Sequence, residues 1–364
     1  LLLKLKINMK LCILGGGLTG LSLAKSLVKK GLSVDIFLDK KNSDFNKSRT
    51  IGISNENLMY FNREILDIKK LLWDIKKIEI YSDNLRNEKI LNFDNNNKTL
   101  FAILRNYQLK NKLLASLKKE KLCKLKTNLS YKLLDLKKYK LIINCENNNY
   151  FSKKFFARSL KKKYDSYAFT TILKHKKIKN NTASQIFTKK GPLAFLPLSE
   201  LETSIVYSIK GKKKINLKEL IKKYNTKYSI INFGDSNFFE LKSSNLRTYY
   251  HKNILAFGDL LHRLHPLAGQ GFNMTIRDIR DLSKLIEFKF RNGLELDSSI
   301  CEEFQNKTRH KNYLFSSGID FVYEFFNFES KMNNNILSKS VRLIGRNKFL
   351  NTSFKNIANK GFEI

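Results

Sequence analysis

Three glycines near the start of the chain have the spacing found in loops that bind dinucleotides. Gly15, Gly17 and Gly20 form the pattern Gly-x-Gly-x-x-Gly around Leu18 and Thr19. The first glycine permits a tight turn, the second lets the backbone approach a diphosphate, and the third lets a helix pack closely on a strand. The free N–H groups and the positive dipole end of the following helix would bind the diphosphate. The spacing therefore predicts a dinucleotide-binding loop.

A second group of residues with binding chemistry lies late in the chain. Gly258-Asp259 follows an apolar run, and the segment 265–273 reads His-Pro-Leu-Ala-Gly-Gln-Gly-Phe-Asn. Asp259 can accept hydrogen bonds from hydroxyl groups. Gly269 and Gly271 would expose backbone amides just before a helix, which makes a cradle for an anion or a carbonyl oxygen.

The elements that must position these residues can be predicted from hydrophobic periodicity. Residues 10–14 read as a strand, 18–31 as a helix and 32–38 as a second strand, which together form a β-α-β unit. An acid that binds the adenosine ribose is expected where the second strand closes. The nearest carboxylate is Asp39, one residue beyond Leu38, so ribose recognition requires the strand to have ended at Leu38. Residues 253–257 predict a further strand, and the apolar spacing from Ile276 to Ile286 predicts a helix.

Other polar side chains have weaker claims to a role in chemistry. We expect His262 and His265 to shape the site rather than transfer protons, and His175 to be a polar partner at a strand end. Arg49 favours a functional role, because a guanidinium after the second strand can pair with phosphate or pack on a ring edge. The sequence contains no Ser-His-Asp arrangement and no cluster of metal ligands, so we expect neither a catalytic side chain nor a metal ion.

Composition narrows the class of protein. The 364 residues carry a formal net charge of +37, from 69 Lys and Arg against 32 Asp and Glu. The lysines are spread along the whole chain, which favours compositional drift over a nucleic-acid-binding patch, while a weak attraction to anionic lipid survives under either explanation. We therefore expect no nucleic-acid partner.

The cysteines and the apolar runs indicate the compartment. Cys12, Cys123, Cys145 and Cys301 lie far apart, which favours neither a disulfide framework nor a metal cage and fits a reducing cytoplasm. No apolar run approaches the roughly 18 residues that span a bilayer. We expect translation to begin at Met9.

Taken together, the early glycine pattern and the late segment Gly-Asp-x-x-His-x-x-His-Pro-x-Ala-Gly-Gln-Gly-x-Asn resemble the FAD-dependent aromatic hydroxylases, most closely those of ubiquinone biosynthesis. Further similar segments are Arg49 to Ser54, Asn106 at the start of a helix, and the strand pair formed by residues 191–198 and 204–207. The resemblance implies that FAD binds to the residues of the two motifs and of these segments, namely Gly15, Gly17, Leu18, Thr19, Gly20, Asp39, Arg49, Asn106, Gly258, Asp259, Pro266, Ala268, Gly269, Gln270, Gly271 and Asn273. Asp259 is expected on the ribityl chain and the 266–271 loop beside the flavin ring.

The resemblance implies a monooxygenase that hydroxylates the ring of a polyprenylated phenol in ubiquinone biosynthesis. In this family NAD(P)H reduces the FAD, and O2 then forms a C4a-hydroperoxide that transfers one oxygen atom. The resemblance also implies two interactions. We expect contact with the inner face of the cell membrane and association with other enzymes of the quinone pathway. The alternative is an FAD-binding accessory subunit that is not catalytic or is reduced separately.

One departure from the family affects this choice. The family has an Asp-Gly motif after a mid-chain strand, and here Glu146-Asn147 follows the apolar residues 141–143. Because that motif contacts FAD and, in relatives, the NAD(P)H diphosphate, the alternative of a separate reductant stays open.

The resemblance also implies the fold class, a Rossmann-like FAD-binding domain of the glutathione-reductase type with an inserted, mainly antiparallel β domain and C-terminal helices. We expect the FAD-binding domain at residues 1–70, 99–160 and 245–295, the β substrate domain at 71–98 and 161–244, and the helical region at 296–364. Within the inserted domain we expect strands at 75–81, 89–93, 167–173, 184–188 and 203–209. A long helix is expected from Ser298 onward and one or two more over 334–362. The aromatic residues of this helical region favour packing of the helices against the FAD-binding domain. In the alternative, Phe349, Leu350, Phe354 and Ile357 would form the apolar face of a basic amphipathic helix that lies on lipid.

Overall fold

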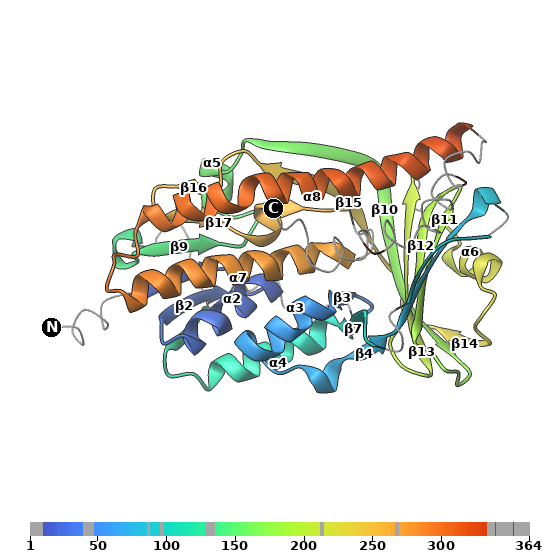
Figure 1. Cartoon of the computed structure of the whole chain (residues 1–364), viewed down its shortest axis with the longest axis horizontal. Coiled ribbons are helices and arrows are strands. Elements are labelled where there is room, and N and C mark those ends of the chain that lie inside the picture. The colour runs from blue at the N-terminus through green and yellow to red at the C-terminus, as the bar shows by residue number, and fades with distance from the viewer. Residues whose placement is uncertain are drawn as a thin grey trace.

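The computed structural model describes residues 10–38, 47–85, 88–94, 98–127, 135–211, 215–265 and 269–332, together with residues 339 and 352. Figure 1 shows two parts side by side, a layered region of sheet and helices and a large β-sheet, with one long helix running along the edge of both. The expected helices over 334–362, including their amphipathic face, lie outside the described residues, apart from the isolated positions 339 and 352.

A mostly parallel sheet forms the layered region. Its strands are, in spatial order, β16 (Tyr250–His251), β17 (Ile254–Ala256), β9 (Leu141–Asn144), β1 (Lys10–Leu14), β2 (Ser33–Leu38) and β8 (Cys123–Thr127). All neighbouring pairs are parallel except β16 with β17. The central strands are continuous apolar runs because helices cover both faces of the sheet. Their carboxyl ends meet at one edge, where ligands of such sheets bind.

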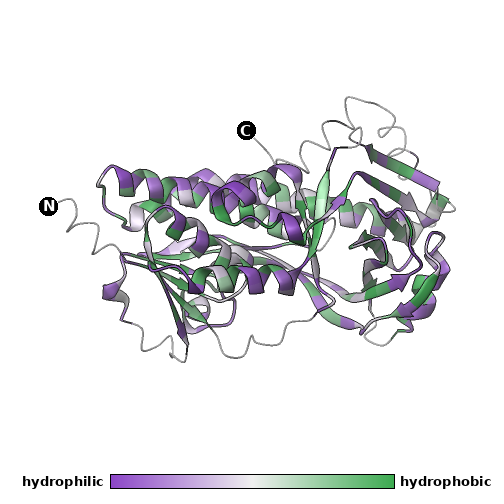
Figure 2. Ribbon diagram, turned by 90° about the horizontal axis from the view of Figure 1, so that it is seen from below, coloured by the Kyte–Doolittle hydropathy of each residue, from purple (hydrophilic) through white to green (hydrophobic). Residues whose placement is uncertain are grey.

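The helices of this region are amphipathic and bury their apolar faces on the sheet. They are α2 (Leu18–Lys29), α3 (Asn55–Tyr60) with a π-helical turn (Phe61–Ile65), α4 (Asn106–Lys118), α5 (Tyr150–Phe155) and α7 (Gln270–Arg291). Figure 2 shows hydrophobic residues along the covered strands and hydrophilic residues on the outer turns of the helices. Short 3-10 turns occupy Lys69–Leu71, Asp83–Leu85, Leu136–Lys138 and Gly258–Leu260.

The second large sheet is antiparallel apart from the pairing of β11 with β5. Its strands are, in spatial order, β18 (His262–Arg263), β15 (Asn237–Leu246), β10 (Ser159–His175), β13 (Glu202–Lys210), β12 (Gly191–Pro197), β11 (Thr182–Thr188), β5 (Lys77–Ser82) and β6 (Glu88–Asp94), and β14 (Ile230–Phe233) also pairs with β10. The helix α6 (Leu217–Tyr224) packs on one face through an apolar cluster that includes Tyr207 and Ile221. The second half of α8 (Ser298–Met332) packs on the other face.

A small sheet joins the two parts. It contains β3 (Thr50–Ser54), β7 (Phe101–Arg105) and β4 (Trp73–Ile75). The single strand that the sequence predicts over 75–81 is wrong, because the chain leaves β4 at Ile75 and enters β5 of the large sheet at Lys77. The backbone N–H of Lys76 donates to Asn181 at 2.9 Å at this crossing. The alternation of apolar residues changes phase at Lys76-Lys77, between Ile75 and Ile78, and this shift was a signal of the crossing that the prediction did not use.

The domain boundaries expected from the sequence can be compared with strand positions. The expected boundary at residue 160 falls inside β10, which begins at Ser159 and pairs along its first residues with β15. After a register shift between Lys163 and Tyr167, β10 stays paired with β15 and also pairs with β13 from Ser166 onward.

Candidate functional site

The glycine loop after β1 has the geometry expected from the sequence. Gly15 adopts a φ of +118°, which few other residues tolerate. A Cβ at Gly20 would lie 2.1 Å from the carbonyl oxygen of Gly15, so only glycine permits this approach of α2 to the loop. Gly17 precedes the first turn of α2, is exposed, and would place a Cβ in open space with no atom within 4 Å. The N-terminus of α2 is therefore accessible to an anionic group.

The Gly258-Asp259 turn lies beside this loop because β17, β9 and β1 are neighbours in the sheet. The N–H of Phe257 donates to Asn144 at 2.8 Å, and the N–H of Cys145 donates to Leu14 at 2.9 Å. Gly258 has a φ of +63°, and a Cβ there would lie 2.6 Å from Cγ2 of Thr19. The two motifs therefore form one edge, with the Asp259 side chain exposed along it.

Arg49 and Asn106 are brought together by the pairing of β3 with β7. The N–H of Asn106 donates to the carbonyl oxygen of Arg49 at 3.1 Å. The Arg49 guanidinium lies 5.1 Å from the ring centroid of Phe239. Loss of hydration lowers the pKa of Arg49 below its ordinary value, and the Asp259 carboxylate opposes the shift. Arg49 is nevertheless exposed, so its guanidinium stays accessible to a ligand.

The start of α7 forms the remaining side of the site. Gly269 adopts the left-handed conformation, with a φ of +62°, and precedes the first turn of the helix. The side chain of Gln270 is buried, and its Oε1 has no hydrogen-bond partner among the described residues. The same holds for Oδ1 of Asn106. Asp39, Pro266 and Ala268, which the sequence assigned to the cofactor, lie outside the described residues.

Asn273 is placed differently from the other predicted cofactor contacts. Its amide nitrogen donates to the carbonyl oxygens of Gly52 at 3.0 Å and Gly269 at 3.2 Å, and its Oδ1 accepts from the N–H of Ser54 at 2.8 Å. Asn57 donates to the same Oδ1 at 3.1 Å. These bonds fill the hydrogen-bonding capacity of the amide. Asn273 therefore holds the 269–271 turn against β3, and this role favours positioning over direct contact with a cofactor.

The residues of this edge fit an FAD molecule. Gly17 leaves space at a helix N-terminus for a diphosphate, and Asp259 offers an acceptor for ribityl hydroxyls. Gln270 and Asn106 each have a side-chain oxygen without a partner among the described residues. Buried polar atoms without partners are rare in folded proteins, and ligand groups are one way to satisfy them.

Sequence comparison relates the chain to hydroxylases of ubiquinone biosynthesis. Over 152 residues, 39% of this chain and 39% of the relative, it is 27% identical to the 3-demethoxyubiquinol 3-hydroxylase of Escherichia coli. Over 125 residues, 34% of this chain and 25% of the relative, it is 29% identical to the mitochondrial ubiquinone biosynthesis monooxygenase COQ6 of Schizosaccharomyces pombe. The matched segments span less than half the length of these relatives. No family model matches the chain.

Comparison with solved structures covers nearly the whole chain. The p-nitrophenol 4-monooxygenase of Pseudomonas putida superposes with a TM-score of 0.78 at 13% identity, covering 97% of this chain and 98% of that chain. PqsL of Pseudomonas aeruginosa, a probable FAD-dependent monooxygenase, gives a TM-score of 0.71 at 14% identity, covering 92% and 99%. The chain has the fold of the FAD-dependent monooxygenases. HpxO of Klebsiella pneumoniae, solved with FAD and uric acid, gives a TM-score of 0.74 at 11% identity, covering 97% and 98%. The fold class expected from the sequence is confirmed.

Glu146, one of the two residues that replace the Asp-Gly expected from the resemblance, lies beside the glycine loop. A Cβ at Gly15 would be 3.0 Å from Cγ of Glu146. The N–H of Glu146 donates to Oδ1 of Asn144 at 3.2 Å, and the two side-chain amides of Asn144 and Asn149 bond each other at 2.7 and 3.2 Å. Asn149 also accepts from the N–H of Ser152 at 2.8 Å and so caps α5. This asparagine network shapes the turn after β9. The sequence analysis missed it, although an Asn three residues before Ser152 at a helix start was a signal for a cap.

The histidines of the monooxygenase motif are both buried and have different partners. His262 bonds Asp278 through Nε2, and Asn312 donates to the other oxygen of Asp278 at 3.1 Å, which links β18, α7 and α8. The ring of His265 lies between Tyr164 and Tyr323, with centroid distances of 5.0 and 4.2 Å. Neither ring nitrogen of His265 has a partner in the part of the chain that the structure describes, and burial lowers its pKa to about 3. These environments favour the structural role expected for both residues. His175, at the end of β10, bonds Thr203 at 3.0 Å, which fits the expected polar role.

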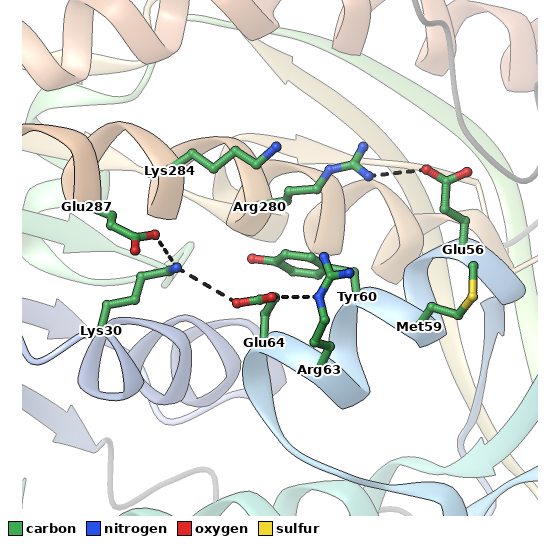
Figure 3. Close-up of a pocket in the computed structure, with 9 residues that line it drawn as sticks. All are labelled: Lys30, Glu56, Met59, Tyr60, Arg63, Glu64, Arg280, Lys284 and Glu287. Atoms are coloured by element: carbon green, nitrogen blue, oxygen red, sulfur yellow. Dashed lines mark hydrogen bonds and ion pairs between the residues drawn. The ribbon is translucent and has the colours of Figure 1, made fainter.

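A charged cleft of about 510 Å³ lies away from this edge, between α2, α3 and α7. Figure 3 shows its lining residues, Lys30, Glu56, Met59, Tyr60, Arg63, Glu64, Arg280, Lys284 and Glu287. Lys30 bonds Glu287 and lies 3.9 Å from Glu64, Arg63 bonds Glu64 at 2.7 Å, and Arg280 bonds Glu56 at 3.3 Å. These ion pairs join three helices, so the charged residues of the cleft are better explained by contacts between helices than by catalysis.

Within the described ranges, no group of three or more His, Cys, Asp or Glu side chains is placed to hold a metal ion. None of the helices in the described part of the chain is both long and apolar enough to cross a bilayer.

Proposed function

We propose that the chain is an FAD-dependent monooxygenase that hydroxylates the aromatic ring of a polyprenylated phenol, with NAD(P)H as electron donor. The observation that carries the proposal is the meeting of the glycine loop, Asp259 and the turn before α7 at one sheet edge, with open space at Gly17. Ubiquinone biosynthesis is the pathway named for the relatives in sequence, which supports this class of substrate.

Each part of the edge has a proposed task. The N-terminus of α2 would bind the diphosphate, and Asp259 would accept hydrogen bonds from the ribityl hydroxyls. Gln270 and the backbone around Gly271 would hold the polar edge of the flavin ring. Arg49, exposed over Phe239, would add positive charge beside the ring. When bound and reduced, FAD activates O2 and supplies the oxygen atom that enters the phenol, so the protein itself needs only to position the ring and exclude water.

The substrate ring is proposed to lie on an uncovered strip of the large sheet. The strip is a row of residues in register across neighbouring strands, in which Gln185 pairs with Ala194 and Ala194 with Val206. These three residues are half-buried, whereas Phe187 and Ala168 on one side and Ala183 and Ser204 on the other are buried.

Two contacts hold this sheet face opposite β3. Oγ of Ser48 lies 2.8 Å from Oγ1 of Thr170, and Oγ1 of Thr50 lies 2.9 Å from Oγ of Ser204. Because Arg49 lies between Ser48 and Thr50, the strip and the proposed flavin site are held close together. A small, mainly apolar strip suits a neutral ring with a greasy substituent.

The test is the visible spectrum of the purified protein, followed by anaerobic addition of NADH or NADPH and then O2. Flavin absorption that bleaches and returns, with a hydroxylated product from a prenylphenol, is the expected result. A protein that cannot be reconstituted with FAD would overturn the proposal. Bound FAD that neither nicotinamide bleaches would instead support the separately reduced or accessory subunit, to which the carboxylate of Glu146 beside Gly15 would be relevant.

The proposal extends to the cellular setting. We infer a cytoplasmic protein that contacts the inner face of the membrane, since a polyprenylated substrate resides there, and that associates with other enzymes of the quinone pathway.

A further inference from the structure

The outward face of α8 changes character along its length. From Glu302 to His310 the exposed residues are polar or charged, whereas from Tyr313 to Phe328 the large exposed residues are apolar. Leu314, Phe321 and Phe328 are seven residues apart and so lie on one face of the helix. Phe321 is 67% exposed and Phe328 is 57% exposed. We call these three residues the apolar stripe, and Tyr313 and Val322 flank it.

The opposite face of the same helix segment is anchored firmly, so the stripe does not arise from a loosely placed helix. Phe326 stacks on Phe187 with a centroid distance of 3.6 Å, and Tyr323 packs edge-on against Tyr164 at 5.0 Å. The nearby acids are engaged with the protein, since Asp320 accepts from Tyr164 and Glu324 pairs with Lys162 at 3.0 Å. Each of these two acids therefore has a protein partner, and Glu324 is paired with a cation.

Exposed lysines lie beside this end of the helix. Lys210 is in register with Ser166, whose hydroxyl bonds Tyr323 of α8, and Lys190 lies in the turn that bonds Lys210. We call these two lysines the basic rim. Figure 1 shows the end of α8 and the neighbouring ends of the sheet strands at the same edge of the molecule.

We propose that the apolar stripe and the basic rim together dock on the surface of an anionic lipid bilayer. Apolar side chains at helical spacing insert at the boundary between headgroups and acyl chains, while lysines within a Debye length add attraction to anionic headgroups. A second copy of the chain is disfavoured as the occupant, because two molecules of net charge +37 repel each other. The inference gives the proposed membrane contact a surface, and it does not depend on the flavin chemistry.

The test uses the full-length chain and flotation with vesicles of phosphatidylcholine alone or with phosphatidylglycerol. We expect binding to the mixed vesicles that falls as salt rises from 0.1 to 1 M, because the screening length shortens from about 10 to 3 Å. The variant Phe321→Ser should bind the mixed vesicles about tenfold more weakly, since it removes one inserted aromatic ring. The matched control is Phe288→Ser, because Phe288 is 62% exposed near the end of α7.

The charge component has its own pair of variants. Lys210→Glu should weaken binding to the mixed vesicles severalfold, whereas Lys70→Glu, at an exposed lysine of the 3-10 turn at Lys69–Leu71, should not. All of these side chains are exposed, so FAD content and unfolding should match those of the wild type in every variant.

Equal binding by Phe321→Ser and the wild type would overturn the proposal, as would equal binding to both kinds of vesicle. Concentration-dependent dimerisation without lipid, abolished by Phe321→Ser, would identify a second copy as the occupant instead. A protein that binds vesicles but never binds FAD would refute the proposed function alone.

Discussion

The side-chain amide of Asn273 donates to the carbonyl oxygen of Gly52 at 3.0 Å and thereby ties the first turn of α7 to β3. Removing this amide should release the turn at Gly269 and leave the N–H of Ser54 without its acceptor. We expect Asn273→Ala to lower the free energy of unfolding by about 1–3 kcal/mol even without FAD. Urea unfolding of the FAD-free protein measures this. The control is Thr275→Ala, which removes only a bond within the same helix to Gly271. If the variant is as stable as the wild type but binds FAD poorly, Asn273 contacts the cofactor directly.

The glycines of the loop should separate binding from folding. Because a Cβ at Gly17 meets nothing within 4 Å, Gly17→Ala should leave the free energy of unfolding within about 1 kcal/mol of the wild type. The added methyl group would occupy the space proposed for the diphosphate. The Kd for FAD should therefore rise tenfold or more, which corresponds to a loss of about 1.4 kcal/mol in binding free energy. Gly20→Ala, whose Cβ would overlap Gly15, should lose both stability and FAD. Titration of flavin fluorescence measures the Kd for FAD of each variant. Unaltered binding by Gly17→Ala would mean that the diphosphate binds elsewhere.

His265 should make the protein acid-sensitive. Its pKa is about 3 in the fold and about 6.5 when the chain is unfolded, so the unfolded chain binds the proton first as the pH falls. The protein therefore has its full stability from this group above pH 6.5 and loses about 1.4 kcal/mol per pH unit below it, until the folded state also protonates. His265→Phe keeps a ring between Tyr164 and Tyr323 and should flatten this dependence. Unfolding midpoints at pH 7, 6 and 5 test the prediction, and equal slopes for the two proteins would contradict it. Retained hydroxylation by the variant would further support a structural role.

His262 should matter for stability through its buried partner. Its ring bonds the buried Asp278, so His262→Phe removes one partner of a buried polar pair and leaves the carboxylate with Asn312. We expect a loss of about 3–5 kcal/mol in unfolding free energy at pH 7. The double variant His262→Phe with Asp278→Leu should recover part of that loss, because both polar partners are then removed. If His262→Phe is as stable as the wild type, the pair does not hold α7 and α8 together.

The proposed site was partly readable from the sequence, because some of its features are local. The glycine loop follows its strand and precedes its helix within a few residues, and the need for glycine at positions 15 and 20 comes from backbone geometry nearby. The same holds for the turn at Gly258 and for the start of α7 at Gln270. The long helix from Ser298 and the strand pair β12 and β13 could also be predicted, since their periodicity is strong and their register needs only a short connection.

By itself, therefore, the sequence determined the motifs and the elements around them, because these depend on neighbours along the chain, and the fold class followed from the resemblance of the motifs to a known family. Only the tertiary structure decided which distant residues meet. The pairing of β3 with β7 brings Arg49 to Asn106, and the crossing at Lys76 divides the predicted strand over 75–81 between two sheets. Burial and long-range partners likewise give His262 and His265 different environments, and they show Asn273 bonded between α7 and β3. The physical reason is that hydrogen bonds and burial between distant segments depend on strand pairing and side-chain packing, which leave no periodic mark on the residues that make them.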